Sequence, residues 1–159
     1  AAVNGGAAGA GASIALCCDI VVACESATFI QAFSKIGLIP DSGGTFFLPR
    51  LIGMQKASAL MMTAEPVSAK DAEKMGMIYK VFSDDSFEQE SWQLVSKLAG
   101  MPTKGLGLTK RLLNASYSNN LEEQLDMEDK CQTIAGNTAD FKEGIEAFFE
   151  KRKPNFKGE

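Results

Sequence analysis

The sequence predicts an α/β fold, with a first half that alternates strands, turns and helices and a second half that is mostly helical. In the first half, short apolar stretches rich in β-branched residues stand between glycine-rich or polar turns. In the second half, apolar residues recur near helical spacing, as do Phe87, Trp92, Val95 and Leu98. We expect a core at residues 1–84 and a helical region at residues 85–159.

Four stretches of the first half are expected to contribute strands. Residues 1–4, AAVN, are interpreted as the end of a strand that enters the Gly/Ala loop GGAAGAG at residues 5–11. DIVVAC is rich in β-branched residues and predicts a short buried strand. SATFIQ and MIYKVF are further strand candidates.

Helices are expected between these strands. The small residues of ASIALCC allow a helix to pack closely against a sheet. Pro49 should kink or divide the helix TFFLPRLIG, which MQKASALMMTA follows. SAKDAEKMG begins with a capping box, Ser68 with Asp71 in place of glutamate, and ends at Gly76. Four longer helices are expected in the second half, at residues 86–100, 103–117, 121–136 and 138–152.

The composition is that of an ordinary globular domain. The chain has 159 residues, of which 45% are hydrophobic and 23% charged, and its net charge is −4. This balance provides no basic footprint for nucleic acid. The uncharged N-terminal stretch is too rich in glycine for a membrane span and lacks the basic region of a signal peptide.

Histidine and cysteine usage narrows the possible chemistry. The chain contains no histidine, which excludes a histidine base, Ser-His chemistry and a histidine-ligated metal within these residues. The four cysteines have no metal-binding spacing, and Cys17, Cys18 and Cys24 lie in an apolar segment. We therefore expect reduced cysteines in the core, no metal site and a cytoplasmic protein.

The first residues predict a chain that begins within a fold. There is no initiator methionine, and AAVNGG is typical of a strand tail that runs into a glycine turn. We expect a fragment or a partial sequence.

Three stretches could carry function, and each also has a purely structural interpretation. The small residues of NGGAAGAGAS let backbone N–H groups at a helix start meet an anion, or only permit tight packing. Asp41, between a proline and two glycines, is a turn and cap residue or a catalytic acid. The tail FFEKRKPNFKG is a solvated helix end or a phosphate-binding patch.

Together these stretches resemble the crotonase family, the enoyl-CoA hydratase/isomerase superfamily. The matching segments are AVNGGAAGAGASIALCCDIVVA, ATFIQAFSKIGLIPDSGGTFFLPRLIG, SAKDAEKMGMIYKV and DFKEGIEAFFEKRKPNFKG, in the family's order. The resemblance implies the ClpP/crotonase fold, a spiral of ββα units, N-terminally truncated. It also implies that the C-terminal helical region trimerises and covers CoA.

The resemblance implies an oxyanion hole and argues against ordinary hydration. In the family, a backbone N–H at the position of Ala10, flanked by Gly9 and Gly11, forms half of the oxyanion hole for the thioester. Hydratases of the family carry glutamates at the positions of Ser13 and Phe33, which here would only line the pocket. Because hydration needs a pair of carboxylates, the chain does not look like a hydratase.

A carboxylate at the position of Asp41 is used by some isomerases and dehalogenases of the family. With Ser13 and Phe33, it looks most like the isomerases of ring-1,2-epoxyphenylacetyl-CoA in phenylacetate degradation. The flanking sequences LIP and GGTFFLP predict an apolar pocket around Asp41, and burial raises the pKa of a carboxyl group. A role as helix N-cap can coexist with catalysis.

The expected function is that of an acyl-CoA isomerase. An enolate stabilised by the oxyanion hole is the intermediate, and Asp41 moves a proton, so that a double bond shifts or a ring epoxide rearranges. No cofactor is expected, because CoA is part of the substrate. Three alternatives stay open: a hydratase, a dehalogenase-like enzyme with Asp41 as nucleophile, and a CoA-binding homologue without turnover.

The resemblance implies binding partners as well. Phe148 should pack near the CoA adenine, and Lys151 should reach a CoA phosphate. The apolar face that carries Phe141, Ile145 and Phe148 needs a partner surface, so a homotrimer or hexamer is expected. Neither nucleic acid nor a membrane is an expected partner.

Overall fold

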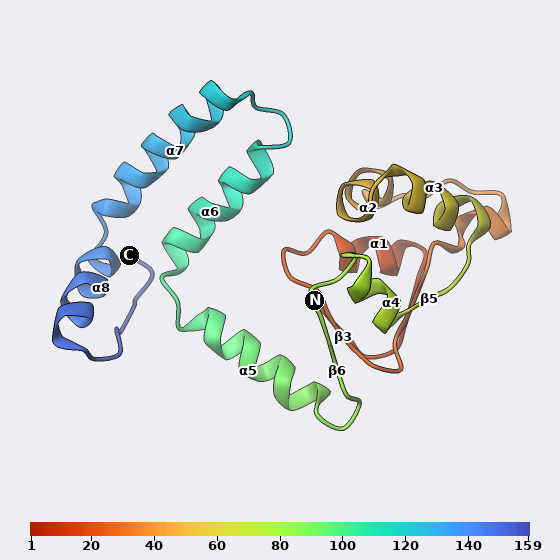
Figure 1. The fold of residues 1–159 in the computed structure, drawn as a ribbon, viewed down its shortest axis with the longest axis horizontal. Helices are drawn as coiled ribbons and strands as arrows, with labels where there is room; N and C mark the ends of the chain where they lie inside the picture. Colours follow the sequence, from red (N-terminus) through yellow and green to blue (C-terminus); the bar gives the residue numbers. More distant parts are fainter. The chain divides into compact units, whose positions relative to one another are not determined.

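The computed structural model describes residues 1–159, which form two compact units, Ala1–Trp92 and Gln93–Glu159 (Figure 1). The boundary between the units lies within helix α5, Phe87–Ala99, between Trp92 and Gln93 and not directly after residue 84 as expected. The roles expected for the two parts, a spiral core and a trimerising region, stay predictions.

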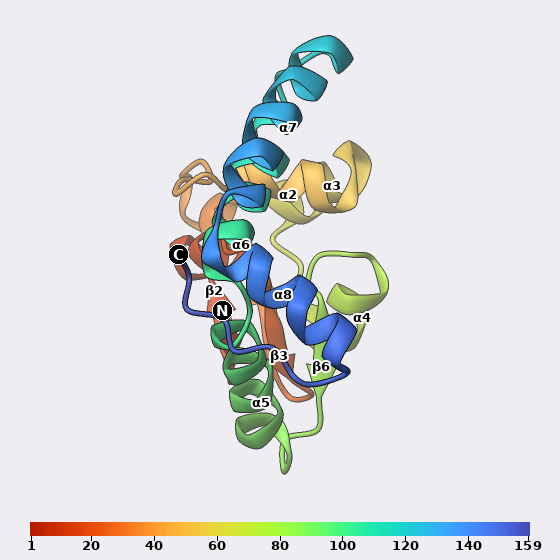
Figure 2. The ribbon, with the colours of Figure 1, turned by 90° about the vertical axis from the view of Figure 1, so that its left-hand side faces the viewer.

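The first unit contains two small sheets, and strands β1 to β4 alternate between them. β1 (Ala2–Val3), β3 (Val22–Cys24) and β6 (Lys80–Phe82) form a parallel sheet, in which β3 lies beside β6 (Figure 2). In the second sheet, β2 (Gly6–Ala8) is parallel to β4 (Thr28–Ile30), and β5 (Val67–Ser68) is antiparallel to β4. The pairs β1–β2 and β3–β4 each place one strand in each sheet and are followed by helices. The chain therefore winds as the predicted spiral of ββα units.

Four helices complete the first unit. They are α1 (Ala10–Leu16), α2 (Gly44–Ile52), α3 (Met54–Thr63) and α4 (Ala69–Lys74), with a 3₁₀ helix at Ala32–Ile36. α1 packs on α2, and α2 on α3 (Figure 1). Leu16, Phe29, Leu48 and Ile52 belong to the apolar core of this unit. The core therefore holds α2 beside α1. It includes Cys24, but the expectation that Cys17 and Cys18 lie in the core is wrong, because both are exposed at the end of α1.

Three local expectations are wrong. The Gly/Ala stretch expected as a loop contains β2, because its backbone pairs with β4 and needs no large side chain for this. α2 is not divided at Pro49: the break comes at Gly53, whose φ of 80° and ψ of 158° suit only glycine. Ser68 caps α4, but the short Asp71 side chain accepts from the Ser68 hydroxyl, so the reciprocal bond to the Ser68 backbone is missing.

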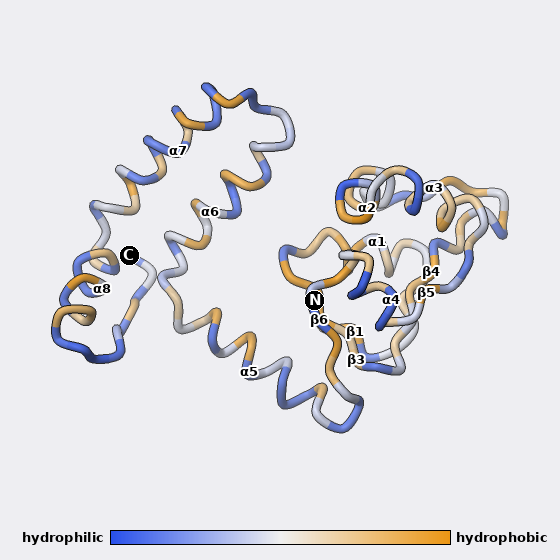
Figure 3. Tube along the Cα trace, viewed as in Figure 1, coloured by the Kyte–Doolittle hydropathy of each residue, from blue (hydrophilic) through white to orange (hydrophobic).

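The second unit is helical, as predicted. After α5, helices α6 (Thr103–Ala115) and α7 (Leu121–Gly136) pack together, and α8 (Ala139–Glu150) contacts α7. Figure 3 shows hydrophilic and apolar residues alternating along α6 and α7. A capping box of Asn120 and Glu123 starts α7, with hydrogen bonds of 3.0 and 2.9 Å. No helix in either unit combines the length and the apolar character that a membrane span needs.

Candidate active site

The turn from β2 into α1 depends on Gly9. Its φ of 53° and ψ of −125° lie in a region that is open to glycine and strained for other residues. The Gly9 N–H donates to the Ile30 carbonyl of β4 at 2.9 Å, which ties this turn to the sheet. Ala10 is the first residue of α1, so its N–H has no carbonyl partner inside the helix. The turn therefore presents a backbone donor at Ala10, the position predicted for the oxyanion hole.

A pair of glycine substitutions tests whether this turn is rigidly specified. Gly9→Ala should lower the free energy of unfolding by about 1–3 kcal/mol, because alanine is strained at the Gly9 φ. Gly11→Ala should raise it by about 0.5–1 kcal/mol, because Gly11 is helical and nothing lies within 4 Å of an added Cβ. Urea unfolding measures both values. Equal effects of the two substitutions would contradict the special role of Gly9.

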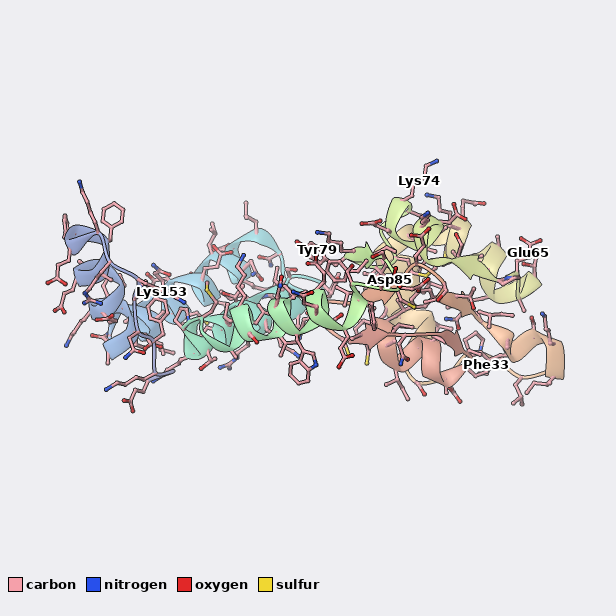
Figure 4. The ribbon with its side chains drawn as sticks, turned by 90° about the horizontal axis from the view of Figure 1, so that it is seen from below. Phe33, Glu65, Lys74, Tyr79, Asp85 and Lys153 are labelled. Carbon is pink, nitrogen blue, oxygen red and sulfur yellow. The ribbon has the colours of Figure 1, made fainter.

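Ser13 and Phe33, at the positions of the family glutamates, are both buried in the first unit. Ser13 is 0% exposed, and its hydroxyl has no hydrogen-bond partner. It lies against α2, since a Cβ added to Gly44 would fall 2.6 Å from Ser13 Oγ. Phe33, labelled in Figure 4, lies against the Gly9 turn, because its ring would be 3.8 Å from a Cβ placed on Gly9. These two side chains therefore close the space around the Gly9 turn with groups that do not exchange protons near neutral pH.

Asp41 lies in the loop that connects the 3₁₀ helix to α2. The Leu38 N–H donates to the Phe33 carbonyl at 3.0 Å, and the Gly44 N–H donates to the Asp41 carbonyl at 2.8 Å. The Ser42 hydroxyl donates to Asp41 Oδ1 at 3.0 Å, and Ser42 has a positive φ of 50°. A non-glycine residue in this conformation is strained, and such strain is found often at functional sites. The loop therefore fixes the carboxylate of Asp41 at the start of α2.

Two expectations about Asp41 are wrong. The N-cap of α2 is Gly43, with no side-chain hydrogen bond, so Asp41 does not cap the helix. The carboxylate is exposed and not buried in an apolar pocket. The physical reason is that its apolar neighbours in the loop are themselves on the surface, with Leu38 59% and Ile39 82% exposed.

An apolar cavity of about 480 Å³ adjoins the Asp41 loop. Its wall includes Pro40, the residue before Asp41, together with side chains of α2 and α3. Leu38, Pro49, Met54, Met61 and Met62 are among the lining residues. A cavity of this size and lining suits an apolar group of a small molecule, and flexible methionines adapt to different shapes.

The two residues predicted to hold CoA lie at the end of α8, in the second unit. Phe148 is 78% exposed, and its ring meets Phe149 edge-on, with centroids 5.8 Å apart. Lys151 follows α8 with a positive φ of 55° and is exposed. Phe141 and Ile145 are exposed as well, so the apolar face predicted on this helix is present.

Sequence analysis missed a set of contacts that we name the C-terminal clasp, in which Asp140 and Glu143 of α8 hold the tail Arg152–Glu159. Arg152 donates to both carboxylate oxygens of Glu143, at 2.6 and 2.9 Å, and the Asn155 N–H donates to Glu143 at 2.7 Å. The buried Asp140 accepts from the backbone N–H groups of Lys157 and Gly158 at 2.6 and 2.8 Å. Glu143 and Arg152 are nine residues apart, a separation that no helical pairing rule predicts.

The clasp should make stability depend on acid. The hydrogen bonds from Arg152 and Asn155, with the charges of Arg152 and Lys157, lower the pKa of Glu143 from 4.5 to about 2. Stability from this group is complete above its unfolded pKa and is lost as pH falls from about 4.5 towards 2. In urea unfolding over this window, Glu143→Gln should lose less stability than the wild type. Identical pH profiles would show that Glu143 is not held in this way.

The fold and the site define a class. A spiral of ββα units, in which helix α1 begins at Ala10 directly after a strand and a glycine turn, is the arrangement expected of the crotonase fold. A family model described as Enoyl-CoA hydratase/isomerase matches residues 1–159, the whole chain. The chain therefore belongs to the enoyl-CoA hydratase/isomerase family.

Relatives in this family include isomerases and hydratases. The 1,2-epoxyphenylacetyl-CoA isomerase of Escherichia coli K12 is 49% identical over 157 residues, which cover 99% of this chain and 60% of the relative. The 2,3-dehydroadipyl-CoA hydratase of the same organism is 39% identical, with 99% and 62% covered. The chain thus spans about 60% of the length of these relatives.

Solved structures share the fold. The enoyl-CoA hydratase/isomerase of Cupriavidus metallidurans CH34 matches with a TM-score of 0.92 and 34% identity, over 99% of this chain and 59% of that one. An enoyl-CoA hydratase of Polaromonas sp. JS666 matches with a TM-score of 0.91 and 37% identity, over 96% and 60%. The predicted crotonase fold is confirmed.

Proposed function

We propose that the protein is an acyl-CoA isomerase in which Asp41 shuttles a proton. The observation that carries the proposal is the contrast between position 41 and positions 13 and 33. Asp41 offers an accessible carboxylate, whereas Ser13 and Phe33 are buried and offer none. One carboxylate suffices for isomerisation, because the proton is moved and not consumed. The 49% identity to an epoxyphenylacetyl-CoA isomerase supports the same conclusion.

The chemistry follows from these residues. The N–H of Ala10 donates to the thioester oxygen, so that negative charge can collect there when a C–H bond breaks. Asp41 takes the proton from that carbon, and the electron pair forms an enolate. Asp41 then returns the proton to another carbon, which shifts the double bond or accompanies the rearrangement of a ring epoxide. Gly9 and Gly11 shape the approach to Ala10, and CoA enters as part of the substrate.

The CoA moiety and the assembly belong to the same proposal. Phe148 offers its exposed ring to the adenine, and Lys151 offers its ammonium to a phosphate. The exposed apolar residues of α8, including Phe141 and Ile145, suit a homotrimer or hexamer. Four free cysteines fit a reducing compartment such as the cytoplasm.

Hydration is the second candidate, because several relatives are named hydratases. The two reactions give different products from an enoyl-CoA thioester: isomerisation keeps its mass, and hydration adds one water. The full-length protein should convert a 3-enoyl-CoA into the 2-enoyl-CoA without adding water, as mass spectrometry of the thioesters would show. A hydrated product would overturn the isomerase proposal in favour of the hydratase. Halide release from an aryl-CoA would favour the dehalogenase alternative, and binding without turnover the non-catalytic homologue.

A further inference from the structure

Lys151, the residue proposed to reach a CoA phosphate, has a backbone conformation that residues other than glycine rarely adopt. Its φ is 55° and its ψ is 35°, at the point where α8 ends. Helices commonly end on a glycine in this left-handed conformation, because the Cβ of other residues makes it unfavourable. A lysine persists there only when neighbouring contacts enforce the conformation.

Arg152 supplies these contacts. The N–H groups of Lys151 and Arg152 return to the carbonyl oxygens of Phe148 and Ala147, at 3.3 and 3.0 Å. The Arg152 guanidinium binds Glu143 through two hydrogen bonds, and its Nε donates to Glu150 at 2.6 Å. Arg152 is therefore bound to two residues of α8, Glu143 and Glu150, and these bonds fix the direction in which the chain leaves Lys151.

The same bonds determine which cation neutralises the nearby carboxylates. The planar fork of arginine fits a carboxylate better than the compact ammonium of lysine does. Arg152 pairs with both Glu143 and Glu150, and the Lys151 ammonium takes part in none of these bonds. Lys151 is thus left for an external anion, while the two carboxylates that would repel that anion are neutralised.

The rest of the clasp keeps this arrangement in place. Phe156 packs on α8, with its ring 3.5 Å from a Cβ added to Gly144, and Asp140 holds the N–H groups of Lys157 and Gly158. A Cβ on Gly158 would fall 2.4 Å from Thr103 Oγ1, so the tail also lies close to the first residue of α6. The tail therefore returns along α8 and does not extend away from Lys151.

We propose that Glu143 and Arg152 are positioning residues, which hold Lys151 in its left-handed conformation and reserve its ammonium for a phosphate group of CoA. This inference rests on the proposed binding of CoA thioesters. In it Glu143 and Arg152 do not touch the ligand and act only through Lys151. It adds to the CoA site two residues that lie outside the group expected from the sequence.

The test measures the Kd of free CoA by calorimetry on the full-length protein, and so does not depend on turnover. Lys151→Ala should raise Kd about fivefold, the upper range for one exposed charge pair. Glu143→Gln should raise it about two- to threefold. The matched control is Glu146→Gln, at an exposed glutamate of α8 that lies outside the clasp, and it should leave Kd unchanged. Circular dichroism confirms that each variant is folded.

The double variant separates positioning from a general structural effect. If Glu143 acts through Lys151, adding Glu143→Gln to Lys151→Ala should cause no further rise in Kd, since there is no ammonium left to position. A Kd for Glu143→Gln equal to that of the wild type would overturn the inference and leave the proposed function standing. The inference would also be overturned if Glu143→Gln raised Kd by the same factor in the wild type and in the Lys151→Ala variant. A wild-type protein that did not bind CoA would overturn the proposed function itself, and this inference with it.

Discussion

Asp41→Asn should lower the rate of acyl-CoA isomerisation by about 10²–10⁴-fold, the usual effect of removing a general base. The amide keeps the shape of the side chain and can still accept a hydrogen bond from the Ser42 hydroxyl, so the loop should retain its conformation. The affinity for the thioester should therefore change little. Steady-state kinetics of the full-length protein measure the effect as a fall in kcat with KM nearly unchanged.

The control for this substitution is Asp85→Asn, which removes another exposed carboxylate of the first unit, labelled in Figure 4. It should leave kcat unchanged. Asp41→Glu should retain part of the activity, because it keeps the carboxylate and changes only its reach. If Asp41→Asn turned over substrate at the wild-type rate, Asp41 would not be the catalytic base, and its only role would be to shape the loop.

The second large effect is expected at Gly44, where α2 meets α1. An added Cβ would lie 2.6 Å from Ser13 Oγ and 3.6 Å from the Pro40 Cβ, in a buried contact. Gly44→Ala should therefore lower the free energy of unfolding by about 1–3 kcal/mol through overpacking. It should also lower kcat, since this contact sets the position of the Asp41 loop beside α1. Urea unfolding and kinetics on the same preparation measure the two effects.

Ser13→Ala provides the compensating change. It removes a buried hydroxyl that has no partner, so alone it should raise stability by about 1–3 kcal/mol. In the Ser13→Ala background, the Cβ of Gly44→Ala keeps only the ordinary van der Waals contacts with the Cβ atoms of residue 13 and Pro40, at 3.5 and 3.6 Å, and its cost should largely disappear. Gly11→Ala, whose added Cβ has nothing within 4 Å, is the comparison without overpacking. If Gly44→Ala lowered stability equally in both backgrounds, its cost would not come from contact with the Ser13 hydroxyl.

Most of the fold could be predicted from the sequence because periodicity and turn residues mark the elements locally. The four long helices of the second half are present, and so are β3, β4 and β6. β2 could not be predicted, because glycine and alanine have low strand propensity and only the pairing with β4 makes a strand of residues 6–8. Of the kink or division expected at Pro49, the division is wrong, because α2 runs on through this proline to Ile52 and the break falls at Gly53.

The site could be predicted only in part, and largely through the resemblance to a family. The position of Ala10 at the start of α1 agrees with that resemblance. The surroundings of Asp41 could not be predicted, because apolar neighbours in the sequence do not guarantee burial of a loop. The C-terminal clasp, including the pair Glu143 and Arg152, could not be predicted, because it depends on the tail folding back along α8, which is a tertiary contact.

Solvent exchange tests the central claim, that Asp41 removes a proton from a bound thioester, most directly. Because Asp41 is exposed, a proton that it has taken should exchange with solvent before it returns to carbon. In deuterium oxide, the full-length wild-type protein should place deuterium on the acyl carbons of a CoA thioester, as mass spectrometry would show. Asp41→Asn should bind the same thioester and leave it unlabelled. Labelling by Asp41→Asn at the wild-type rate would contradict the claim and assign the proton transfer to another group.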